Sequence, residues 1–413
     1  MSYFHLNLIL QGKLTVCCLL MLSAMPLNAQ REAKQIGDFK ESISLNEHLR
    51  GTKRTLQYRP DGDEFVCVNG KNRYTRALYG SHSPFRVETS DRPVFAFYNN
   101  GRGGNISFKV ILRDGTELAL DRTGHCESRY SAGKRTYYLT DPSWGKGELR
   151  ISVLALADMD GAIWRFSPSN MPKGAILRWQ HGGATGKRLS RNGDMGVDPA
   201  DCFELPVEAT DLVTGELPLQ KEVYLVRGEV PEGYNVRKLY QQAEAASLAL
   251  ASHLKIETPD PYLNTLGGAL VAAADGIWDG QVWLHGAIGW RMPLSGWRAG
   301  YTGDALGWHD RARTHFDAYA ASQVTVVPNT IPHPAQDSTM NLARSEKRWG
   351  TPQYSNGYIC RNPERNNQMH HYDMNLCYMD ELLWHFNWTG DTAYVRKMWP
   401  VITRHLAWEK IKL

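Results

Sequence analysis

Cysteine is scarce in this chain of 413 residues and shows none of the spacings that mark a metal site or a disulfide framework. Two of the seven cysteines lie in an apolar run near the N-terminus. The others are widely spaced, without a C-x-x-C pair: Cys67, Cys126, Cys202, Cys360 and Cys377. This pattern excludes a zinc knuckle and a dense disulfide scaffold and predicts free buried thiols. A Cys360–Cys377 bridge is the alternative in an oxidising compartment.

The sequence also lacks a large excess of charge of either sign, and it has only one long apolar run, near the N-terminus. The formal net charge is +4, and no long basic run is present, so we expect no nucleic-acid partner. After the N-terminal run no second long apolar run occurs, and we expect no membrane span in the mature chain. The hydrophobic share of 42% is ordinary for a globular protein, and the length allows two or three domains. The sequence indicates no cofactor and no particular oligomeric state.

The N-terminus has the features of an export signal. Lys13 precedes the apolar run LTVCCLLMLSAMPLNA, which is followed by Gln30 and the charged segment REAK. The run is too short, and too soon followed by charge, for a good membrane span. Ala29 and Leu27 occupy the cleavage positions, and Ala29 has the small side chain that cleavage requires. We therefore predict a signal peptide at residues 1–29 and a bacterial protein exported to the periplasm or the medium.

Short β-rich segments fill residues 40–230. They include FVCVNG, VFAFY, ISFKVIL, TYYLT, LRISVLAL, AIWRF and EVYLV, with turn signals between them. Asn69-Gly70 and Asp114-Gly115 are candidates for two-residue type I′ hairpins. Because no helical periodicity intervenes, the segment predicts an antiparallel β-sandwich domain. Within it, four side chains either bind a ligand or form an Arg–Tyr cluster at a domain interface, and we favour the interface: Arg73, Tyr74, Arg76 and Tyr79.

Helical patterns replace the strands after about Pro231. Residues 231–257, rich in Ala, Leu and Gln, predict a linker helix, and the segment Thr258–Pro261 breaks it. A polar stretch from Val327 to about Gln368 is too long for a plain connector and predicts a functional loop. Two further helices close the chain as an antiparallel hairpin. Thr389-Gly390-Asp391 forms its turn, and Asp391 is placed to cap the second helix.

Tryptophan is concentrated between Asp275 and Phe316, where it alternates with charged residues and glycine. The five indoles are Trp278, Trp283, Trp290, Trp297 and Trp308. Carboxylates and guanidinium groups are costly to bury unpaired, whereas five indoles are not expected on a wet surface. Aromatic faces beside hydrogen-bonding side chains suit a sugar ring. The stretch predicts a sugar site, and the alternative is amphipathic helices with Trp in the core.

At this point the chain resembles the six-hairpin glycosidase superfamily. A β-sandwich precedes a linker helix and helical hairpins, and WTGDTAYVRKMWPVI resembles the recurring hairpin turn of α/α-barrel glycosidases. TGDALGWHDRA resembles the active-site segment of α-L-rhamnosidase-type enzymes. Leu306, Gly307 and Trp308 match its Leu-Gly-Trp, whereas Thr302 and Gly303 depart from its Arg-Asp. The layout is closest to secreted six-hairpin proteins of polysaccharide-degrading bacteria.

The resemblance implies a multidomain β plus α fold: an N-terminal antiparallel β-sandwich, a linker helix, then a partial (α/α)6 barrel over residues 258–413. A complete barrel needs twelve helices, whereas the segment after Pro261 has room for about four or five. We therefore expect a chain that is truncated at its C-terminus and inactive by itself. In the family, the second catalytic carboxylate usually comes from a later hairpin.

Asp304 is the candidate general acid, because the resemblance places it on the family's acid, which is there a Glu. Glycosidic hydrolysis pairs an acid with a base or nucleophile, with carboxyls about 5–9.5 Å apart. The segment around Asp304 is rich in Gly and Trp, an apolar setting that suits a carboxyl acting as an acid. The alternative interpretation is that Asp304 caps a helix starting at Ala305.

Further side chains are candidates for sugar binding. They are Asp279, Trp290, Arg291, Trp297, Arg298, Trp308, Asp310, His370, His371 and Asp373. For Arg291 and Arg298, internal salt bridging is the equal alternative. Asp279 is also suited to a solvated turn. His370 and His371 are adjacent on a helix and point about 100° apart, so a shared metal ion is disfavoured.

The sequence therefore predicts a secreted glycoside hydrolase, or part of one, that acts on a complex, plant-type poly- or oligosaccharide. Two alternatives stay open. One is a non-catalytic carbohydrate-binding protein that uses the same tryptophans, and the other is a phosphorylase or lyase with an α/α fold, since a fold does not determine the chemistry.

The export prediction has a direct test. We expect protein secreted from the native host to begin at Gln30, because residues 1–29 are removed after translocation. N-terminal sequencing of the secreted material measures this. A secreted chain that still begins at Met1 would refute it.

Overall fold

The computed structural model describes most of the chain after residue 56. The described ranges are 57–71, 76–99, 102–183, 211–230, 232–287, 291–296, 299–326, 330–331, 353–366 and 373–412. The expected signal peptide and most of the predicted functional loop lie outside these ranges. So do five of the predicted site residues: Trp290, Trp297, Arg298, His370 and His371.

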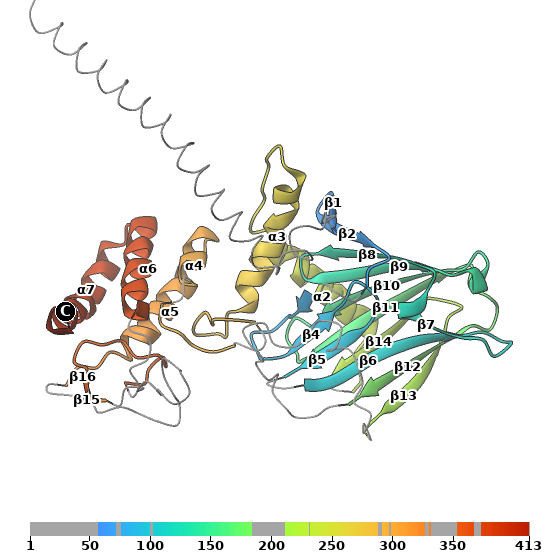
Figure 1. Cartoon of the computed structure of the whole chain (residues 1–413), viewed down its shortest axis with the longest axis horizontal. Coiled ribbons are helices and arrows are strands. Elements are labelled where there is room, and N and C mark those ends of the chain that lie inside the picture. The colour runs from blue at the N-terminus through green and yellow to red at the C-terminus, as the bar shows by residue number, and fades with distance from the viewer. Residues whose placement is uncertain are drawn as a thin grey trace, which may run out of the picture. The chain divides into compact units, whose positions relative to one another are not determined.

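Two antiparallel sheets form the N-terminal part of the described chain (Figure 1). The first has the order β1 (Arg59–Asp61), β2 (Glu64–Val68), β8 (His125–Ser131), β9 (Lys134–Thr140), β10 (Glu148–Ala155), β11 (Gly161–Ser169) and β14 (Val223–Gly228). The second has the order β13 (Val213–Pro218), β12 (Ile176–Gly182), β6 (Arg102–Ile111), β5 (Phe95–Tyr98), β4 (Arg86–Thr89) and β3 (Arg76–Leu78), and β7 (Glu117–Ala119) also pairs with β6.

Helices follow the sheets, so the predicted order of β then α is confirmed. They are α2 (Val236–Ala251), α3 (Pro261–Gly276), α4 (Tyr301–Ala305), α5 (His309–Ala320), α6 (Asp373–Thr389) and α7 (Thr392–Lys412). A small ribbon pairs β15 (Thr330–Ile331) with β16 (Gln353–Tyr354). The partial barrel stays a prediction. In the described part of the chain, no helix is both long and apolar enough to cross a membrane.

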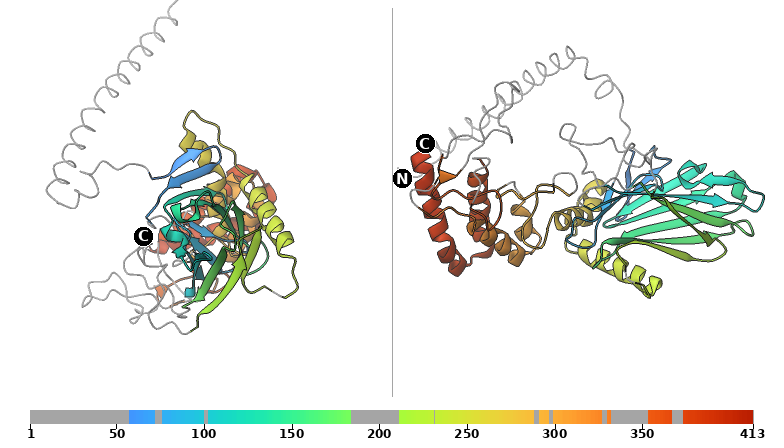
Figure 2. Two further views of the ribbon diagram at one scale, coloured as in Figure 1. Left: turned by 90° about the vertical axis from the view of Figure 1, so that its right-hand side faces the viewer. Right: turned by 90° about the horizontal axis from the view of Figure 1, so that it is seen from below.

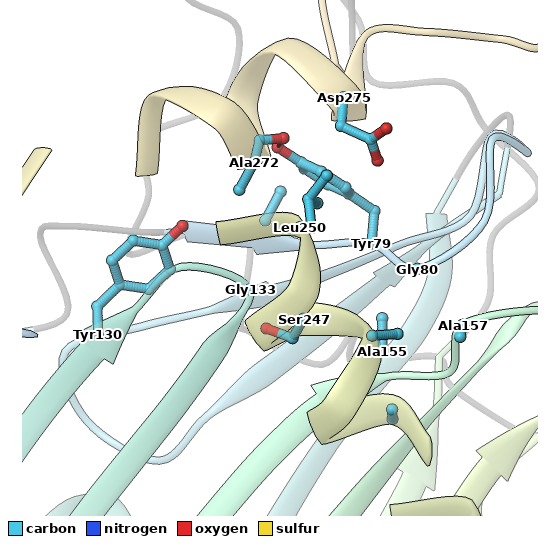
Figure 3. A pocket seen from close by; sticks show the side chains of 13 residues that line it. Tyr79, Gly80, Tyr130, Gly133, Ala155, Ala157, Ser247, Leu250, Ala272 and Asp275 are labelled. Carbon is cyan, nitrogen blue, oxygen red and sulfur yellow. Dashed lines mark hydrogen bonds between the residues drawn. The ribbon is translucent and has the colours of Figure 1, made fainter. Parts of the chain in front are cut away.

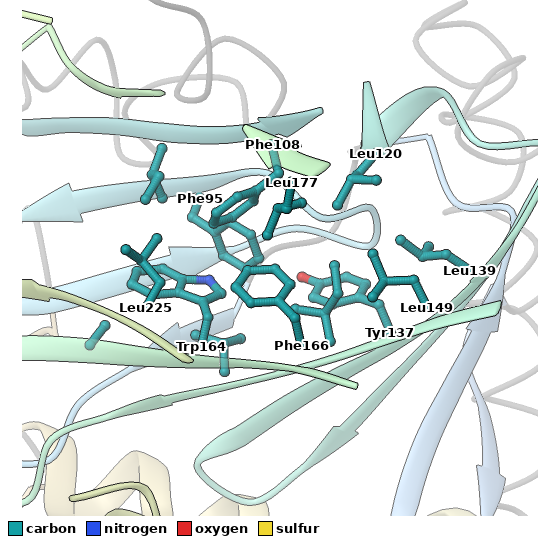
Figure 4. Close-up of a cluster of buried hydrophobic side chains, with 14 of the residues drawn as sticks. Phe95, Phe108, Leu120, Tyr137, Leu139, Leu149, Trp164, Phe166, Leu177 and Leu225 are labelled. Atoms are coloured by element: carbon teal, nitrogen blue, oxygen red, sulfur yellow. The ribbon is translucent and has the colours of Figure 1, made fainter. Parts of the chain in front are cut away.

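An aromatic core joins the two sheets face to face (Figure 4). Phe95 of β5 meets Trp164 of β11 edge-on, with 5.5 Å between ring centroids. Phe108 of β6 lies 6.1 Å from the same indole. Neighbouring positions on β11 point to opposite faces, because side chains alternate along a strand. Trp164 therefore enters this core, while Ile163 belongs to a second cluster with Leu239 of α2.

That second cluster attaches α2 to the outer face of the first sheet, in contact with β10, β11 and β14 (Figures 1 and 2). Asn235 caps the helix, since its side chain accepts a hydrogen bond from the backbone N–H of Lys238 at 3.1 Å. The next helix, α3, begins at Pro261, and Asp260 caps it through the N–H of Tyr262 at 2.8 Å. The segment 258–261, where a break between helices was predicted, therefore contains the capped start of α3.

The two predicted type I′ hairpins were wrong in detail. Asn69-Gly70 joins no hairpin, because β2 pairs with β1 and β8 rather than with the next strand. Asn69 instead exchanges hydrogen bonds with the backbone of Cys126 on β8. Asp114-Gly115 does lie in a hairpin, between β6 and β7, but the loop spans residues 112–116 and only Gly115 has a positive φ, of 85°.

Two local predictions for the helices and thiols are confirmed. The Oδ1 atom of Asp391 accepts from the N–H groups of Ala393 and Tyr394, both at 3.0 Å, and so caps α7. The four cysteines in the described ranges form no disulfide. Cys67, Cys126 and Cys360 are buried as predicted, whereas Cys377 is only partly buried. The alternative of a Cys360–Cys377 bridge is thereby wrong.

A polar contact connects the loop after β3 with the end of α3. The hydroxyl of Tyr79 donates to the carbonyl of Ala272, and Arg86 donates to the carbonyl of Gly276. The Arg86 guanidinium also lies 4.7 Å from the centroid of the Tyr79 ring. Burial lowers the pKa of Arg86 to about 10. Of the predicted Arg–Tyr cluster, Tyr79 makes such a contact, but with Arg86, while Arg76 lies over the ring of Tyr130. Arg73 and Tyr74 lie outside the described residues.

The contact requires a residue without a side chain at Gly276, because the ring of Tyr79 lies against its backbone. A Cβ added at Gly276 would overlap the ring of Tyr79, so Gly276→Ala should destabilise the fold by about 1–3 kcal/mol. In a Tyr79→Ala background the ring is absent, and the same change should be neutral or stabilising by a few tenths of a kcal/mol, because Ala favours a helix. Denaturant unfolding of the four proteins measures the difference. An equal cost in both backgrounds would exclude the clash.

Candidate functional site

The candidate site is built on the turn between α4 and α5. Trp308 N–H donates to the carbonyl of Gly303 at 2.7 Å, and Gly307 N–H donates to that of Asp304 at 3.0 Å. With φ of 75° at Gly307, this is a Schellman ending of α4, which needs a residue that tolerates the left-handed conformation. The Leu306-Gly307-Trp308 motif is therefore a helix stop. It places Asp304 just before the turn and His309 at the start of α5.

Asp304 is a buried carboxylate that contacts two imidazoles. Its Oδ1 atom lies 2.7 Å from Nδ1 of His309. Nδ1 of His385, which comes from α6, lies 2.9 Å from Oδ1 and 2.8 Å from Oδ2. The side chains of Asp304 and His385 expose 3% and 0% of their surface, whereas that of His309 exposes 42%. One buried anion thus links α4, α5 and α6.

The alternative role of Asp304 as a helix cap is not what the structure shows. Asp304 lies inside α4, and no helix starts at Ala305. The next helix, α5, begins at His309, and its cap position, Trp308, makes no side-chain capping bond. The role of Asp304 in catalysis stays a prediction.

The tryptophans of the predicted sugar site are core residues wherever the structure describes them. Trp278, Trp283 and Trp308 expose 4%, 0% and 9% of their surface and belong to one hydrophobic cluster with α5, α6 and α7. The rings of Trp278 and Trp283 lie 4.7 Å apart. A Cβ at Gly303 would overlap Trp283, so glycine here allows close packing. For these three indoles the core interpretation is the correct one.

The guanidinium of Arg311 covers the face of Trp308, 4.4 Å from its ring centroid. Arg311 also donates to Asp275 at 2.7 Å, and Asp275 contacts Nε2 of His82 at 3.4 Å. Burial by itself raises the pKa of Asp275, but the hydrogen bonds from His82 and Arg311 outweigh it and hold the pKa below its ordinary value. Trp308 is therefore part of a cation–π and ion-pair network and offers no open stacking face.

The side chains of Arg291 and Asp279 both form hydrogen bonds with backbone groups. Arg291 donates to the carbonyls of His82 and Gly276. Asp279 accepts from the N–H groups of Gln281 and Val282, at 2.9 and 2.7 Å, and so closes a turn. For Arg291 the alternative was internal salt bridging, and the structure shows backbone carbonyls as its partners instead.

Asp310 and Asp373 both lie in the first turns of helices. Asp310, in α5, has a fully exposed side chain 3.9 Å from Arg313. Asp373 is the exposed first residue of α6. Carboxylates are favourable near the positive end of the helix dipole, which accounts for both positions without a ligand. Within the described ranges, no group of three or more His, Cys, Asp or Glu side chains is arranged to hold a metal ion.

A small cavity lies beside Asp275, at the contact between the sandwich and α3 (Figure 3). Its volume is about 50 Å³, and Tyr79, Ser247 and Leu250 contribute to its lining. Pockets for drug-sized ligands are much larger, about 300–1,000 Å³. This cavity can hold a few water molecules and does not fit a sugar.

His309 and His385 are the residues that the sequence reasoning missed as functional candidates. His309 lies within the segment TGDALGWHDRA, so the sequence alone could have indicated it as a candidate. His385 has the helical spacing of a core position on α6, and a titratable side chain at such a position is a signal for a buried polar partner. The partner itself is 81 residues away in sequence and could not be identified without the fold.

Comparisons with known proteins give limited information. A family described as a domain of unknown function, DUF4450, matches residues 100–228. No curated protein matches the chain. A solved structure that is similar is a bacterial glucoamylase complexed with acarbose, with a TM-score of 0.40 and 10% sequence identity. The match covers 65% of this chain and 52% of that one, so the chain spans about half the length of the glucoamylase. A similarity this weak supports no conclusion about function.

The Asp304 contacts generate a prediction about stability. In Asp304→Asn the amide oxygen can accept from both imidazoles at the position of Oδ1, but the amide NH2 group then replaces Oδ2, which lies 2.8 Å from Nδ1 of the buried His385. Two donors face each other there. The substitution should destabilise the fold by about 1–3 kcal/mol. Denaturant unfolding is the measurement, and Asp310→Asn is the matched control.

Asp310 is a carboxylate six residues along the same segment, and its side chain is fully exposed. The control variant should unfold like the wild type. If Asp304→Asn also unfolds like the wild type, the carboxylate is not what links these helices.

Proposed function

We propose that this chain is a carbohydrate-active protein of the glycoside hydrolase class, with the Asp304–His309 pair as its acid–base group. The observation that carries the proposal is the buried Asp304 carboxylate 2.7 Å from the half-exposed imidazole of His309. An imidazole oriented by a carboxylate is a common arrangement for transferring protons near neutral pH. The pair lies in the segment that resembles the active-site segment of α-L-rhamnosidase-type enzymes.

The proposed substrate is a complex poly- or oligosaccharide, met outside the cytoplasm. The apolar run that ends at Ala29 supports export, and the order of sandwich, linker helix and helical hairpins supports the glycosidase class. The described pairing supplies one acid–base group. In this class of enzyme a second group must activate water or attack the anomeric carbon, and we assign no residue to that role.

A non-catalytic carbohydrate-binding protein is the second candidate, and a specific observation favours it. Trp384 and Trp388 of α6 and Trp399 of α7 expose 51%, 57% and 54% of their surface. Exposed indoles can stack on the C–H face of a sugar ring. This candidate uses a different set of tryptophans from the Trp-rich stretch, whose described indoles are buried.

One assay separates these classes. The full chain is incubated with oligosaccharide fragments of plant cell-wall polysaccharides, with and without inorganic phosphate. The masses of the products are then measured by mass spectrometry. Hydrolysis adds water to each cleaved bond, phosphorolysis adds phosphate, and a lyase leaves an unsaturated end without added water. We expect products of hydrolysis. This differs from the expectation, drawn from the resemblance, that the chain is inactive by itself, and it rests on the Asp304–His309 pair, which lies wholly within these residues.

Asp304→Asn is the matching variant, and its rate per folded molecule should fall by about 10²- to 10⁴-fold, the usual effect of acid–base catalysis. Quenching of tryptophan fluorescence by the fragments, without any cleavage, would favour the binding protein. Cleavage that Asp304→Asn leaves undiminished would contradict the acid–base assignment.

A further inference from the structure

The three side chains of the Asp304 cluster differ sharply in their access to solvent. Asp304 and His385 are buried, with 3% and 0% of their side-chain surface exposed, while His309 exposes 42%. A group that gives a proton to a bound ligand must reach it within hydrogen-bond distance, about 2.6–3.2 Å. By this criterion His309 is the member of the cluster that can meet a ligand.

Hydrogen-bonding capacity assigns the protons in the cluster. With Asp304 taken as the carboxylate, which only accepts hydrogen bonds, each imidazole nitrogen that contacts it is assigned a hydrogen. Both contacts use Nδ1. Each ring is therefore held as the Nδ1–H donor, and its Nε2 points away from the carboxylate.

The two rings then have different surroundings. His385 is enclosed by the rings of Phe316 and Tyr394, with centroids 5.5 and 5.3 Å away. Its Nε2 is buried and has no hydrogen-bond partner among the described residues. It can exchange no proton with a ligand from that position, and its contact with both oxygens of Asp304 holds the carboxylate in place. The ring of His309 can contact a ligand, because it lies at the start of α5 and is half exposed.

We infer that His309 is the residue that transfers the proton to the sugar, and that Asp304 and His385 are positioning residues behind it. This assignment rests on the proposed function. It moves the direct acid role from the Asp304 carboxyl to Nε2 of His309. Asp304 orients the ring through the contact at Nδ1.

Nε2–H of the protonated His309 gives its proton to the glycosidic oxygen as the bond from that oxygen to the anomeric carbon breaks, and the oxygen keeps the bonding pair. A water molecule adds to the anomeric carbon and releases one proton to bulk water. His309 regains a proton from bulk water before the next turnover.

Three variants test the assignment on the oligosaccharide that the wild type cleaves fastest. His309→Gln keeps a polar side chain but transfers no proton, and it should lower turnover by about 10²- to 10⁴-fold. His309→Ala should recover part of its turnover when free imidazole is added. His125→Gln, at an exposed histidine on β8, is the matched control and should keep full turnover. Thermal melts confirm that all three variants fold.

A second measurement needs no substrate. In a long-range proton–nitrogen NMR spectrum of the ¹⁵N-labelled wild type, His309 should show a protonated Nδ1, and Asp304→Asn should weaken this preference. A neutral His309 ring with its hydrogen on Nε2 would overturn the positioning role of Asp304. His125 provides the reference ring in the same spectrum.

The possible failures are distinguishable. A wild type that cleaves normally, with His309→Gln equally active, overturns the role of His309 and leaves the proposed function intact. A wild type that neither binds nor cleaves any fragment contradicts the proposed function, and the assignment of His309 fails with it. Loss of turnover in His309→Gln together with rescue of His309→Ala by imidazole supports both.

Discussion

A buried carboxylate must be surrounded by hydrogen-bond donors, and this requirement organises the helical half of the protein. Transferring an unpaired carboxylate into an apolar interior is prohibitively costly. Asp304 meets the requirement with one imidazole from the next helix and one from α6, more than 80 positions along the chain from Asp304. The same contacts bring three helices together and leave one of the two rings half exposed. These hydrogen bonds thus serve the proposed chemistry and add to the apolar packing that holds the helices together.

The sequence was sufficient for the features that depend on local patterns. Short β-rich segments with turn signals predicted the two antiparallel sheets, because strand-forming residues and turn residues are local signals in the sequence. Asp391 was predicted correctly as a cap for the same reason, since capping needs only the next three residues. Asn69-Gly70 failed because strand pairing is not local. The dipeptide is a strong hairpin signal, but β2 pairs with β8. Asn69 forms hydrogen bonds with Cys126 of β8 and so extends that pairing.

The candidate site shows a similar division. The Leu306-Gly307-Trp308 motif directed attention to Asp304, and in the structure the motif ends α4 with a glycine at the left-handed position. Charged residues among the tryptophans suggested an open sugar site. In the structure Arg311 covers Trp308, and Asp275 balances Arg311, so the charges are compensated inside the core. A pattern of residue types cannot distinguish a ligand from an internal partner, because both supply the same hydrogen bonds.

The most direct measurement is a crystal structure of the full chain with a bound oligosaccharide fragment. We predict a glycosidic oxygen within hydrogen-bond distance of Nε2 of His309, about 2.6–3.2 Å, with Nδ1 of the same ring still on Asp304. A fragment bound on the exposed tryptophans of α6 and α7, with His309 facing only solvent, would contradict the assignment of the Asp304–His309 pair as the acid–base group.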